Sequence, residues 1–578
     1  MRTRDRQYWG ALPKADGIWS VAIWAPAAKA GFVNVDGKAH LLTKADDGTF
    51  RGLIDAVPGA PYHFVIDDQR LPDPAARLQS GDVHDDSRLA TLTADRTGRD
   101  WRGRDWRDSV ISEIHIGTFT AEGTFAAAAR RLSDLASLGI NTVEVMPIAQ
   151  FAGHRGWGYD GVLPYAVQPD YGTPDDFAEF VRTAHSLGVS VILDVVYNHF
   201  GPEGAYLGSI CPAFFDADRT TPWGPAIDFT RAPVREFFIQ NAIMWVRDYG
   251  VDGLRLDAVH QLQDPSTPEF LAELATRLRA LDLPRPVHLI TEDERNLSVH
   301  RDVGLIDATW NDDYHHSLHC LLTGESEGYY APFAVDPIAD LAKALTEGHV
   351  AQGQARPDDA HDGSPRGAPS AHLPPDAFVN ANQTHDQIGN RALGDRLIAL
   401  TSPQPMRVAH AMLLTSPFVP MLFQGEEIGA RTPFPFFCDF QGDLADIVRK
   451  GRLAEFSAFQ GFGGDFPDPL EVETFSRARP YDSPPDDADE WLTLTARLLA
   501  WRRDRVLPLL QSGQTGSSAT VIGPRALAVT WSFGAGDLHS VIQLGQAIDK
   551  DHWPGGGDSL AIGASQDDFA FCTWTSPT

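Results

Sequence analysis

Between residues 110 and 423 the sequence alternates short apolar runs with longer amphipathic segments, and this alternation limits the fold more than any other feature. The short runs have the length and content of buried strands, and most segments between them repeat apolar residues at helical spacing. The predicted strands are 110–116, 142–147, 189–197, 254–259, 287–290, 305–309, 378–381 and 419–423. Eight such units predict an α/β fold, a (β/α)8 TIM barrel with insertions. A doubly wound open sheet is the alternative, disfavoured because no glycine-rich phosphate-binding turn follows the first strand.

Start and stop signals place helices between these strands. Helices are expected over 126–138, 175–187, 234–249 and 269–281. Thr173-Pro174 and Thr267-Pro268 each combine an N-cap residue with a proline at the first helical position. Gly250 and Gly253 end the third helix before the fourth strand begins.

The segments on either side of the alternating region are predicted to be separate β domains. Residues 18–66 show strand-like alternation with Gly/Asp turns, and no helix-length periodic run occurs before about residue 124. That pattern predicts an N-terminal β-sandwich of immunoglobulin-like layout. The expected domains are a β-sandwich at 1–105, a barrel at 106–510 and a small C-terminal β domain at 511–578. Residues 351–375 and 465–489 are expected to be flexible loops or lids over the site.

Charge and cysteine content argue against several classes of function. The formal net charge of −30 disfavours nucleic acid or an anionic membrane as the main partner, and it says little about a neutral sugar. The four cysteines form no CxxC pair, so neither a disulfide framework nor a zinc site is expected. The N-terminus lacks the apolar stretch of a secretory signal, and no run approaches a membrane span. We therefore expect a cytoplasmic protein.

Three acidic residues lie where predicted strands end. Asp257 lies near the C-terminal end of the fourth strand, Glu292 at the end of the fifth, and Asp386 follows the seventh, and the carboxyl ends of barrel strands form the reacting face. Neighbouring strands lie about 4.8 Å apart. Asp257 and Glu292 can therefore face each other near the ~5–5.5 Å separation of retaining glycosidases, short of the ~6.5–9.5 Å of inverting ones. A structural ion pair between Arg255 and Asp257 is the alternative explanation, and the two further acids favour a catalytic site.

Four sequence blocks resemble the conserved blocks of the α-amylase family of glycoside hydrolases. They are Asp194–His199, Gly253–His260, Ile290–Glu292 and His385–Asp386, joined by Trp157–Asp160. The resemblance covers about 110–500 and implies a barrel with an N-terminal β-sandwich. It implies that Asp257 is the nucleophile, kept ionised by Arg255 because an adjacent cation favours the charged form. Glu292 would be the general acid and base, with a raised pKa, and Asp386 would stabilise an oxocarbenium-like transition state.

The resemblance also implies residues that bind the substrate. Tyr159 would offer an aromatic face to the sugar, and the polar contacts would come from His199, Arg255, His260, Asp313, Tyr314, His315, His316, His385 and Gln387. Asp194 is expected to orient Arg255. Asn198 and Asp194 resemble positions that help to hold calcium in some amylases, but no cluster of further oxygen ligands is evident, and Ca²⁺ requires six to eight. We therefore expect no metal and no cofactor.

Four further segments resemble the branch of the family that releases trehalose from maltooligosyl trehalose. They are Gly201–Leu207, Trp310–His316, His385–Arg391 and Val448–Arg452. The implied enzyme cuts the α-1,4 bond next to the terminal trehalose and works in sequence with a maltooligosyltrehalose synthase. A glycogen branching or debranching enzyme is the closest alternative, and a non-catalytic relative is disfavoured because all three acids are present. Thr384 departs from the asparagine expected before His385, which puts the substrate contacts near Asp386 in doubt.

Overall fold

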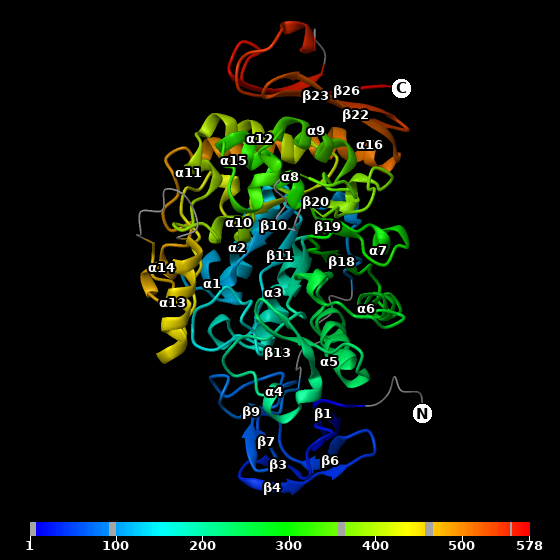
Figure 1. Ribbon diagram of the computed structural model, residues 1–578, viewed down its shortest axis with the longest axis vertical. Coiled ribbons are helices and arrows are strands. Elements are labelled where there is room, and N and C mark those ends of the chain that lie inside the picture. Colours follow the sequence, from blue (N-terminus) through cyan, green and yellow to red (C-terminus); the bar gives the residue numbers. More distant parts are fainter. Residues whose placement is uncertain (1–6, 92–99, 357–363, 457–465, 555–557, 578) are drawn as a thin grey trace.

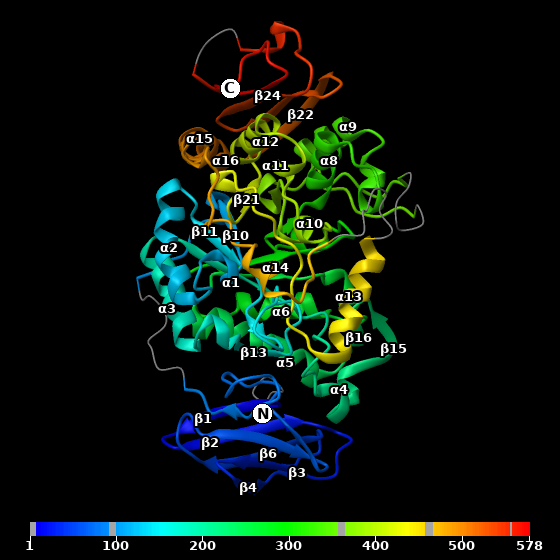
Figure 2. The same ribbon diagram turned by 90° about the vertical axis from the view of Figure 1, so that its left-hand side faces the viewer.

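The computed structural model describes residues 7–91, 100–356, 364–456, 466–554 and 558–577. Three parts follow one another along its long axis (Figure 1): a β-sandwich at the N-terminal end, a barrel in the middle and a β-sheet at the C-terminal end. The same order is visible after a quarter turn (Figure 2).

Eight parallel strands close the central barrel, in chain order. They are β10 (Ile111–Ile114), β11 (Thr142–Val145), β14 (Ser190–Val195), β17 (Gly253–Leu256), β18 (His288–Thr291), β19 (Ala308–Trp310), β20 (Phe378–Ala381) and β21 (Val419–Phe423). The barrel closes where β10 pairs with β21, with Ser112 opposite Leu422. Each predicted strand segment supplies one barrel strand, so the barrel is confirmed and the open-sheet alternative is wrong.

Apolar side chains from six of the barrel strands form one buried cluster. Its members include Ile111, Ile192, Ile290, Trp310 and Met421. A barrel of this kind has a packed core rather than a pore, so its chemistry occurs at the strand ends.

Helices surround the barrel, and most begin and end where the sequence predicts. Those expected from the sequence are α2 (Phe125–Leu138), α3 (Pro174–Ser186), α5 (Ala232–Ile243) and α6 (Phe270–Arg279). Thr173 caps α3 in a capping box with Asp176. A π-helix, Met244–Tyr249, extends α5 and ends at Gly250, whose φ of 82° suits glycine.

The start signal predicted at Thr267-Pro268 is wrong. Helix α6 begins at Phe270 with Glu269 as its N-cap, and neither Thr267 nor Pro268 takes part in the cap. Asp264 accepts the Phe270 backbone N–H instead, over 2.7 Å. A side chain from the preceding loop thus satisfies a first-turn donor that local spacing assigned to threonine.

The remaining helices lie in the barrel's connections and insertions. They are α1 (Ile116–Phe119), α4 (Leu207–Ile210), α7 (Val299–Asp302), α8 (Asp312–Thr323), α9 (Pro337–Glu347), α10 (His385–Gly389), α11 (Leu397–Leu400), α12 (Pro403–Thr415), α13 (Gly442–Phe456), α14 (Val472–Ser476), α15 (Ala488–Trp501) and α16 (Leu507–Gln511). None of the helices in the described part of the chain is long and apolar enough to cross a membrane.

The two predicted loops differ in how much regular structure they contain. Of 351–375, residues 357–363 lie outside the described residues, and the described remainder forms turns and irregular segments. The segment 465–489, of which 465 is not described, contains α14 and the start of α15. The second segment is therefore partly helical rather than a plain loop.

The flanking domains consist mainly of β structure. In the N-terminal part, one sheet has the order β1 (Gly10–Ala15), β2 (Ile18–Trp24), β6 (Thr49–Asp55), β5 (Thr43–Lys44), and the other β4 (Lys38–Leu41), β3 (Gly31–Val35), β7 (Pro61–Ile66), β8 (Gln69–Leu71), with β9 (Ser87–Arg88) on β7. The C-terminal sheet has the order β22 (Gln514–Gly523), β23 (Ala526–Phe533), β24 (Gly536–Leu544), β26 (Phe569–Ser576), β25 (Ser559–Ile562). We propose the domain boundaries after residues 105 and 510.

Candidate active site

Arg255 is the centre of a polar network at the carboxyl ends of β14, β17 and β18. Nη1 donates to Asp194 Oδ2 over 2.7 Å and to Asp257 Oδ1 over 2.9 Å, and Nη2 donates to Glu292 Oε2 over 2.6 Å. The guanidinium lies over the Trp310 ring, 4.0 Å from its centre. One cation therefore holds three carboxylates from three consecutive strands of the barrel.

Burial separates Asp194 from the other two carboxyl groups that Arg255 binds. The side chains of Arg255 and Asp194 are 1% exposed, whereas those of Asp257 and Glu292 are 11% and 21% exposed. Burial raises the pKa of Asp194 to about 7, despite the opposing effect of Arg255. Asp194 is thus an orienting group behind Arg255, as the sequence predicts, and Asp257 and Glu292 are the groups that a substrate can reach.

Asp257 is fixed at both carboxylate oxygens. Arg255 binds Oδ1, and the amide nitrogen of Asn198 donates to Oδ2 over 2.8 Å and to the Asp257 carbonyl over 2.9 Å. The next residue, Ala258, has a left-handed backbone with φ of 41°, which turns the chain sharply after the strand. An aligned carboxylate next to a cation has the properties of a nucleophile.

Glu292 carries the features of a group that gives and takes a proton. Burial raises its pKa, the charge of Arg255 lowers it and that of Asp257 raises it, and the net direction is upward. Besides Arg255, the backbone N–H of Ala258 donates to Oε2 over 3.1 Å. A carboxyl with a raised pKa beside an ionised one is the pattern of an acid–base residue.

Asp386 lies in the first turn of α10, across the barrel mouth from β17. Asn390, one turn later, donates to its Oδ1 over 2.7 Å. Burial raises the pKa of Asp386, His385 lowers it and the charge of Glu292 raises it, with a net increase. Asp386 and Glu292 line the same cleft, so their titrations are linked through one electrostatic field.

Thr384, the residue that departs from the expected asparagine, is the N-cap of α10. Its hydroxyl accepts the Asp386 backbone N–H over 3.2 Å and contacts Gln387 Oε1 at 2.7 Å, while Gln387 Oε1 accepts the Thr384 backbone N–H. The side chain is therefore used in a capping box that positions Asp386.

An aromatic group borders the acids. The Tyr159 ring stacks on His385 at 5.0 Å between centroids, and its hydroxyl donates to Asp194 Oδ2 over 2.7 Å. Trp157 meets His385 edge-on at 5.4 Å. The His385 Nδ1 and backbone N–H both bind the buried carboxylate of Glu113 on β10.

A cleft of about 240 Å³ opens beside Glu292 and Asp386. Predicted site residues that line it are His260, Glu292, Asp313, His316, Asp386 and Gln387. Further lining residues are Glu294, Asn296, Asp312, Tyr329, Pro332, Phe333, Arg366 and Asn390. The mixture of carboxyl, amide, imidazole and aromatic groups suits the hydroxyls and apolar faces of a sugar.

The predicted contacts at residues 313–316 divide by their position on α8. Asp313 and His316 line the cleft, although Asp313 Oδ2 is occupied by the N–H groups of Val350, Ala351 and Asn296. Tyr314 is fully buried and donates to Asn382 Oδ1, and His315 is buried with Nδ1 on the Asn382 carbonyl. The helix directs these two side chains into the core. The prediction that they contact the substrate is therefore wrong, and both side chains pack inside the protein.

His199 does not line this cleft. It is buried, hydrogen-bonds Asn198 Oδ1 through Nδ1 and stacks on Trp223 at 4.9 Å between ring centroids. Burial lowers its pKa to about 4, so the imidazole is neutral. His260, in contrast, approaches Glu294 Oε1 at 3.4 Å within the cleft.

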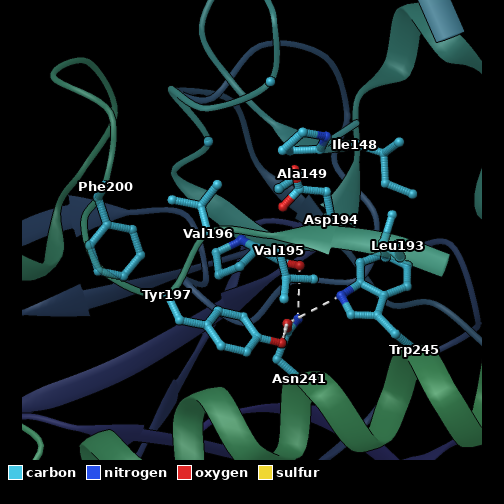
Figure 3. Close-up of a pocket in the computed structure, with 14 residues that line it drawn as sticks. Ile148, Ala149, Leu193, Asp194, Val195, Val196, Tyr197, Phe200, Asn241 and Trp245 are labelled. Atoms are coloured by element: carbon cyan, nitrogen blue, oxygen red, sulfur yellow. Dashed lines mark hydrogen bonds between the residues drawn. The ribbon is translucent and has the colours of Figure 1, made fainter. Parts of the chain in front are cut away.

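A second, much smaller cavity lies behind Asp194 (Figure 3). Its volume is about 20 Å³, and it is lined by Leu193, Val195 and the side chain of Asn241, which accepts from the Tyr197 hydroxyl and the Trp245 indole. That volume holds about one water and no sugar. Of these two cavities, the cleft at Glu292 and Asp386 is the one large enough for a sugar.

Several residues of the site were not predicted from the sequence. Glu113 is an acid inside an apolar strand, and Trp310 is an aromatic at a strand end; neither has a local signal that separates it from core. Asp312 stands next to the predicted Asp313 and lines the cleft, with Gln387 Nε2 at 3.4 Å. Asn390 is four residues after Asp386, a spacing that on a helix could have indicated the contact.

Comparison with known proteins agrees with this geometry. Residues 83–211 match the family "Alpha amylase, catalytic domain". The chain is 40% identical over 543 residues to the malto-oligosyltrehalose trehalohydrolase of Deinococcus radiodurans, covering 93% of this chain and 89% of that protein. It superposes on the crystal structure of an alpha-amylase-type protein from Salmonella typhimurium with a TM-score of 0.93 at 40% identity, over 98% and 99% of the two chains. A 1,4-alpha-glucan branching enzyme of Mycobacterium bovis is 29% identical over 46% of this chain and 42% of its own.

Proposed function

The chain belongs to the malto-oligosyltrehalose trehalohydrolase family, and from that premise we propose that it is a retaining glycosidase that releases trehalose from maltooligosyl trehalose. The bond cleaved is the α-1,4-glucosidic bond next to the terminal trehalose. The observation that carries the proposal is Arg255 holding Asp257 and Glu292 at the edge of a sugar-sized cleft that Asp386 also lines.

In the first step, Asp257 attacks the anomeric carbon of the glucose that precedes trehalose, and the bond from that carbon to the trehalose oxygen breaks. Glu292 gives its proton to that oxygen, so trehalose leaves as a neutral alcohol and a glycosyl ester remains on Asp257. The raised pKa of Glu292 supports this role, because the acid must hold a proton near neutral pH.

In the second step, Glu292, now a carboxylate, takes a proton from water, and the water oxygen attacks the anomeric carbon. The ester bond to Asp257 breaks and a maltooligosaccharide with the original α configuration is released. Asp257 and Glu292 bind neighbouring nitrogens of one guanidinium. That shared contact supports a short carboxyl separation, and hence retention rather than inversion.

The other residues bind the reacting sugar and its neighbour. Asp386 stabilises the positive charge that develops on the sugar ring, and Tyr159 and His385 cover one side of that ring. The trehalose unit lies in the cleft beyond Glu292, against His260, Asp313, His316 and Gln387, all of which line it. His199 and Arg255 act beside Asp257, through a neutral imidazole and the guanidinium respectively.

The reaction belongs to a two-enzyme sequence in which a maltooligosyltrehalose synthase makes the substrate. We place it in the cytoplasm, supported by the four cysteines (Cys211, Cys320, Cys438 and Cys572), which are buried and free. No metal and no cofactor is assigned a part in the reaction.

Product analysis tests the proposal. Incubation with maltooligosyl trehalose should release trehalose and a maltooligosaccharide, and ¹H NMR during the first turnovers should show the α anomer before mutarotation. A changed branch count in amylose, without trehalose release, would favour a glycogen branching enzyme instead. An initial β anomer would contradict the retaining mechanism while leaving the substrate assignment intact.

A further inference from the structure

Glu113 connects the first barrel strand to the catalytic face. It lies in β10, is 1% exposed and is 272 residues before the residue that it binds. Its Oε1 accepts from the His385 ring at Nδ1, and its Oε2 accepts from the His385 backbone N–H over 3.1 Å. Both carboxylate oxygens are thus used on one histidine, a two-point contact that fixes the ring and the start of α10 together.

The His385 ring has little freedom to turn. Tyr159 stacks on it with 22° between the planes, and Trp157 meets it edge-on at 86°. No described residue forms a hydrogen bond with His385 Nε2, so with Nδ1 held by Glu113 this nitrogen is the one left for the substrate. A hydrogen on Nε2 makes it a donor, the character that a sugar hydroxyl oxygen needs.

Charges from every neighbouring element decide whether His385 carries both protons. Burial lowers its pKa, but the charge and hydrogen bond of Glu113 and the charge of Asp386 outweigh burial and Arg255, so the net direction is upward. His115, in the turn after β10, does not compete, because burial lowers its pKa to about 3. Tyr159 stays neutral because burial raises its pKa well above the ordinary value.

Glu144 is the nearest comparable carboxyl. It pairs in register with Glu113 on the neighbouring strand β11, is 1% exposed, and forms no hydrogen bond with His385 within the described structure. Burial raises its pKa well above the ordinary value, although a side-chain hydrogen bond from Trp310 acts in the opposite direction. The barrel therefore contains two buried carboxyl groups side by side, of which one binds the histidine and the other does not.

We propose that Glu113 is a positioning residue that holds His385 as a fixed hydrogen-bond donor towards a hydroxyl of the sugar attacked by Asp257. The inference rests on the proposed function and extends it, since the hydrolase reaction alone assigns no part to the first barrel strand. Glu113 acts through His385 and does not touch the substrate. Removing its carboxyl group should lower the pKa of His385, leave the ring freer to turn and weaken the hydrogen bond that it gives.

The first test needs no substrate. In protein labelled with ¹³C at histidine Cε1, the His385 signal, identified by its absence from His385→Gln, should titrate above the ordinary histidine value of about 6.5. In Glu113→Gln the same signal should titrate at a lower pH than in the wild type. Glu144→Gln, which replaces the buried carboxyl in register with Glu113 on β11, should leave it unmoved. A wild-type His385 that titrates at or below the ordinary value overturns the proposal, whatever the variants do.

The second test is a double-mutant cycle with trehalose release as the readout. Glu113→Gln should lower kcat roughly 10- to 100-fold at pH 7, because the His385 ring is no longer held in place and its pKa falls. It should recover towards the wild type as the pH falls. In the His385→Gln background Glu113→Gln should add no more than about twofold, whereas independent, multiplying effects would contradict a role through His385.

Failure of the two proposals can be told apart. If the cycle shows coupling on another α-glucan while no trehalose is released from maltooligosyl trehalose, the substrate assignment fails and the role of Glu113 stands. If trehalose is released and Glu113→Gln, folded by its thermal unfolding profile, keeps wild-type kcat and pH dependence, the role of Glu113 fails alone.

Discussion

Arg255 donates from Nη2 to Glu292 Oε2 over 2.6 Å, while Nη1 of the same guanidinium binds Asp257. The proposed acid is therefore in contact with a cation that opposes its protonation, and its raised pKa is the outcome of burial and of Asp257 against that cation. As Asp257 loses its charge to the glycosyl ester, the repulsion that raises the pKa of Glu292 falls. The pKa of Glu292 then falls and its ionised form is favoured, which is the form that acts as the base in the second step.

Replacing Asp257 by asparagine tests the nucleophile. The change keeps the shape and leaves Asn198 and Arg255 in place, but an amide cannot form the glycosyl ester, so kcat should fall by several orders of magnitude. Circular dichroism and Tm should stay close to the wild type. Near-normal turnover in pure protein would mean that another carboxylate attacks the sugar.

Replacing Glu292 by glutamine tests the acid and base. General acid–base catalysis contributes about 10²–10⁴-fold, so turnover of the oligosaccharide should fall by at least about 10³-fold when both steps lose it. A maltooligosyl fluoride needs no protonated leaving group, so this variant should still give a burst of fluoride and accumulate a glycosyl ester on Asp257, visible by mass spectrometry. Absence of both burst and adduct would argue against separate roles for the two acids.

Replacing Arg255 by lysine tests the shared cation. A single ammonium cannot reproduce a planar fork that binds three carboxylates, so kcat should fall at least about 10²-fold. Stability should also fall, because breaking one side of a buried ion pair typically costs about 3–5 kcal/mol. Arg247→Lys, in the half-exposed pair with Asp248, is the matched control and should change neither kcat nor Tm. Equal effects at the two sites would show that Arg255 has no special role.

The sequence predicts the barrel and the three acids for the same reason. Each strand is a short apolar run with clear bounds. Asp257 and Glu292 come directly after such runs and Asp386 follows one after four residues, so their positions indicate the reacting face. Glu113 escapes prediction because it lies inside an apolar strand, and its partner His385 is far away in the chain. The prediction that Tyr314 and His315 contact the substrate is wrong for the opposite reason. They are next to cleft residues in the sequence, but α8 directs their side chains into the core.

Asp312 and Asp313 are adjacent carboxyls whose pKa shifts have opposite signs. Burial and the charges of Glu292 and Asp386 raise the pKa of Asp312 to about 8. Burial also opposes ionisation of Asp313, but Arg366 and His349 outweigh it and its pKa is lowered. The folded state thus binds the Asp312 proton more tightly than the unfolded chain does, and the Asp313 proton less tightly.

These shifts predict opposite dependences of stability on pH. For Asp312, stability is lost as pH rises from the unfolded pKa near 3.9 towards 8 and is level above that. Asp312→Asn should therefore raise Tm over the wild type by an amount that grows from pH 4 to 8. Asp313→Asn should lower Tm most at neutral pH, and the difference should shrink as pH falls through the lowered pKa. Calorimetry from about pH 2 to pH 8 checks both, because the Asp313 difference shrinks only below the unfolded pKa near 3.9. Parallel curves for the two variants would refute the assigned signs.

The last prediction concerns Thr384 and distinguishes a helix-capping role of its hydroxyl from a contact with the substrate. Its hydroxyl accepts the Asp386 backbone N–H and completes the capping box of α10. Thr384→Ala should lose about 0.5–2 kcal/mol of stability, and kcat should fall because Asp386 is no longer held. Asparagine is as good an N-cap as threonine or better, so Thr384→Asn should keep both Tm and kcat. Measuring kcat and KM separately decides the role: an alanine variant with raised KM, unchanged kcat and unchanged Tm would instead place the Thr384 hydroxyl on the sugar.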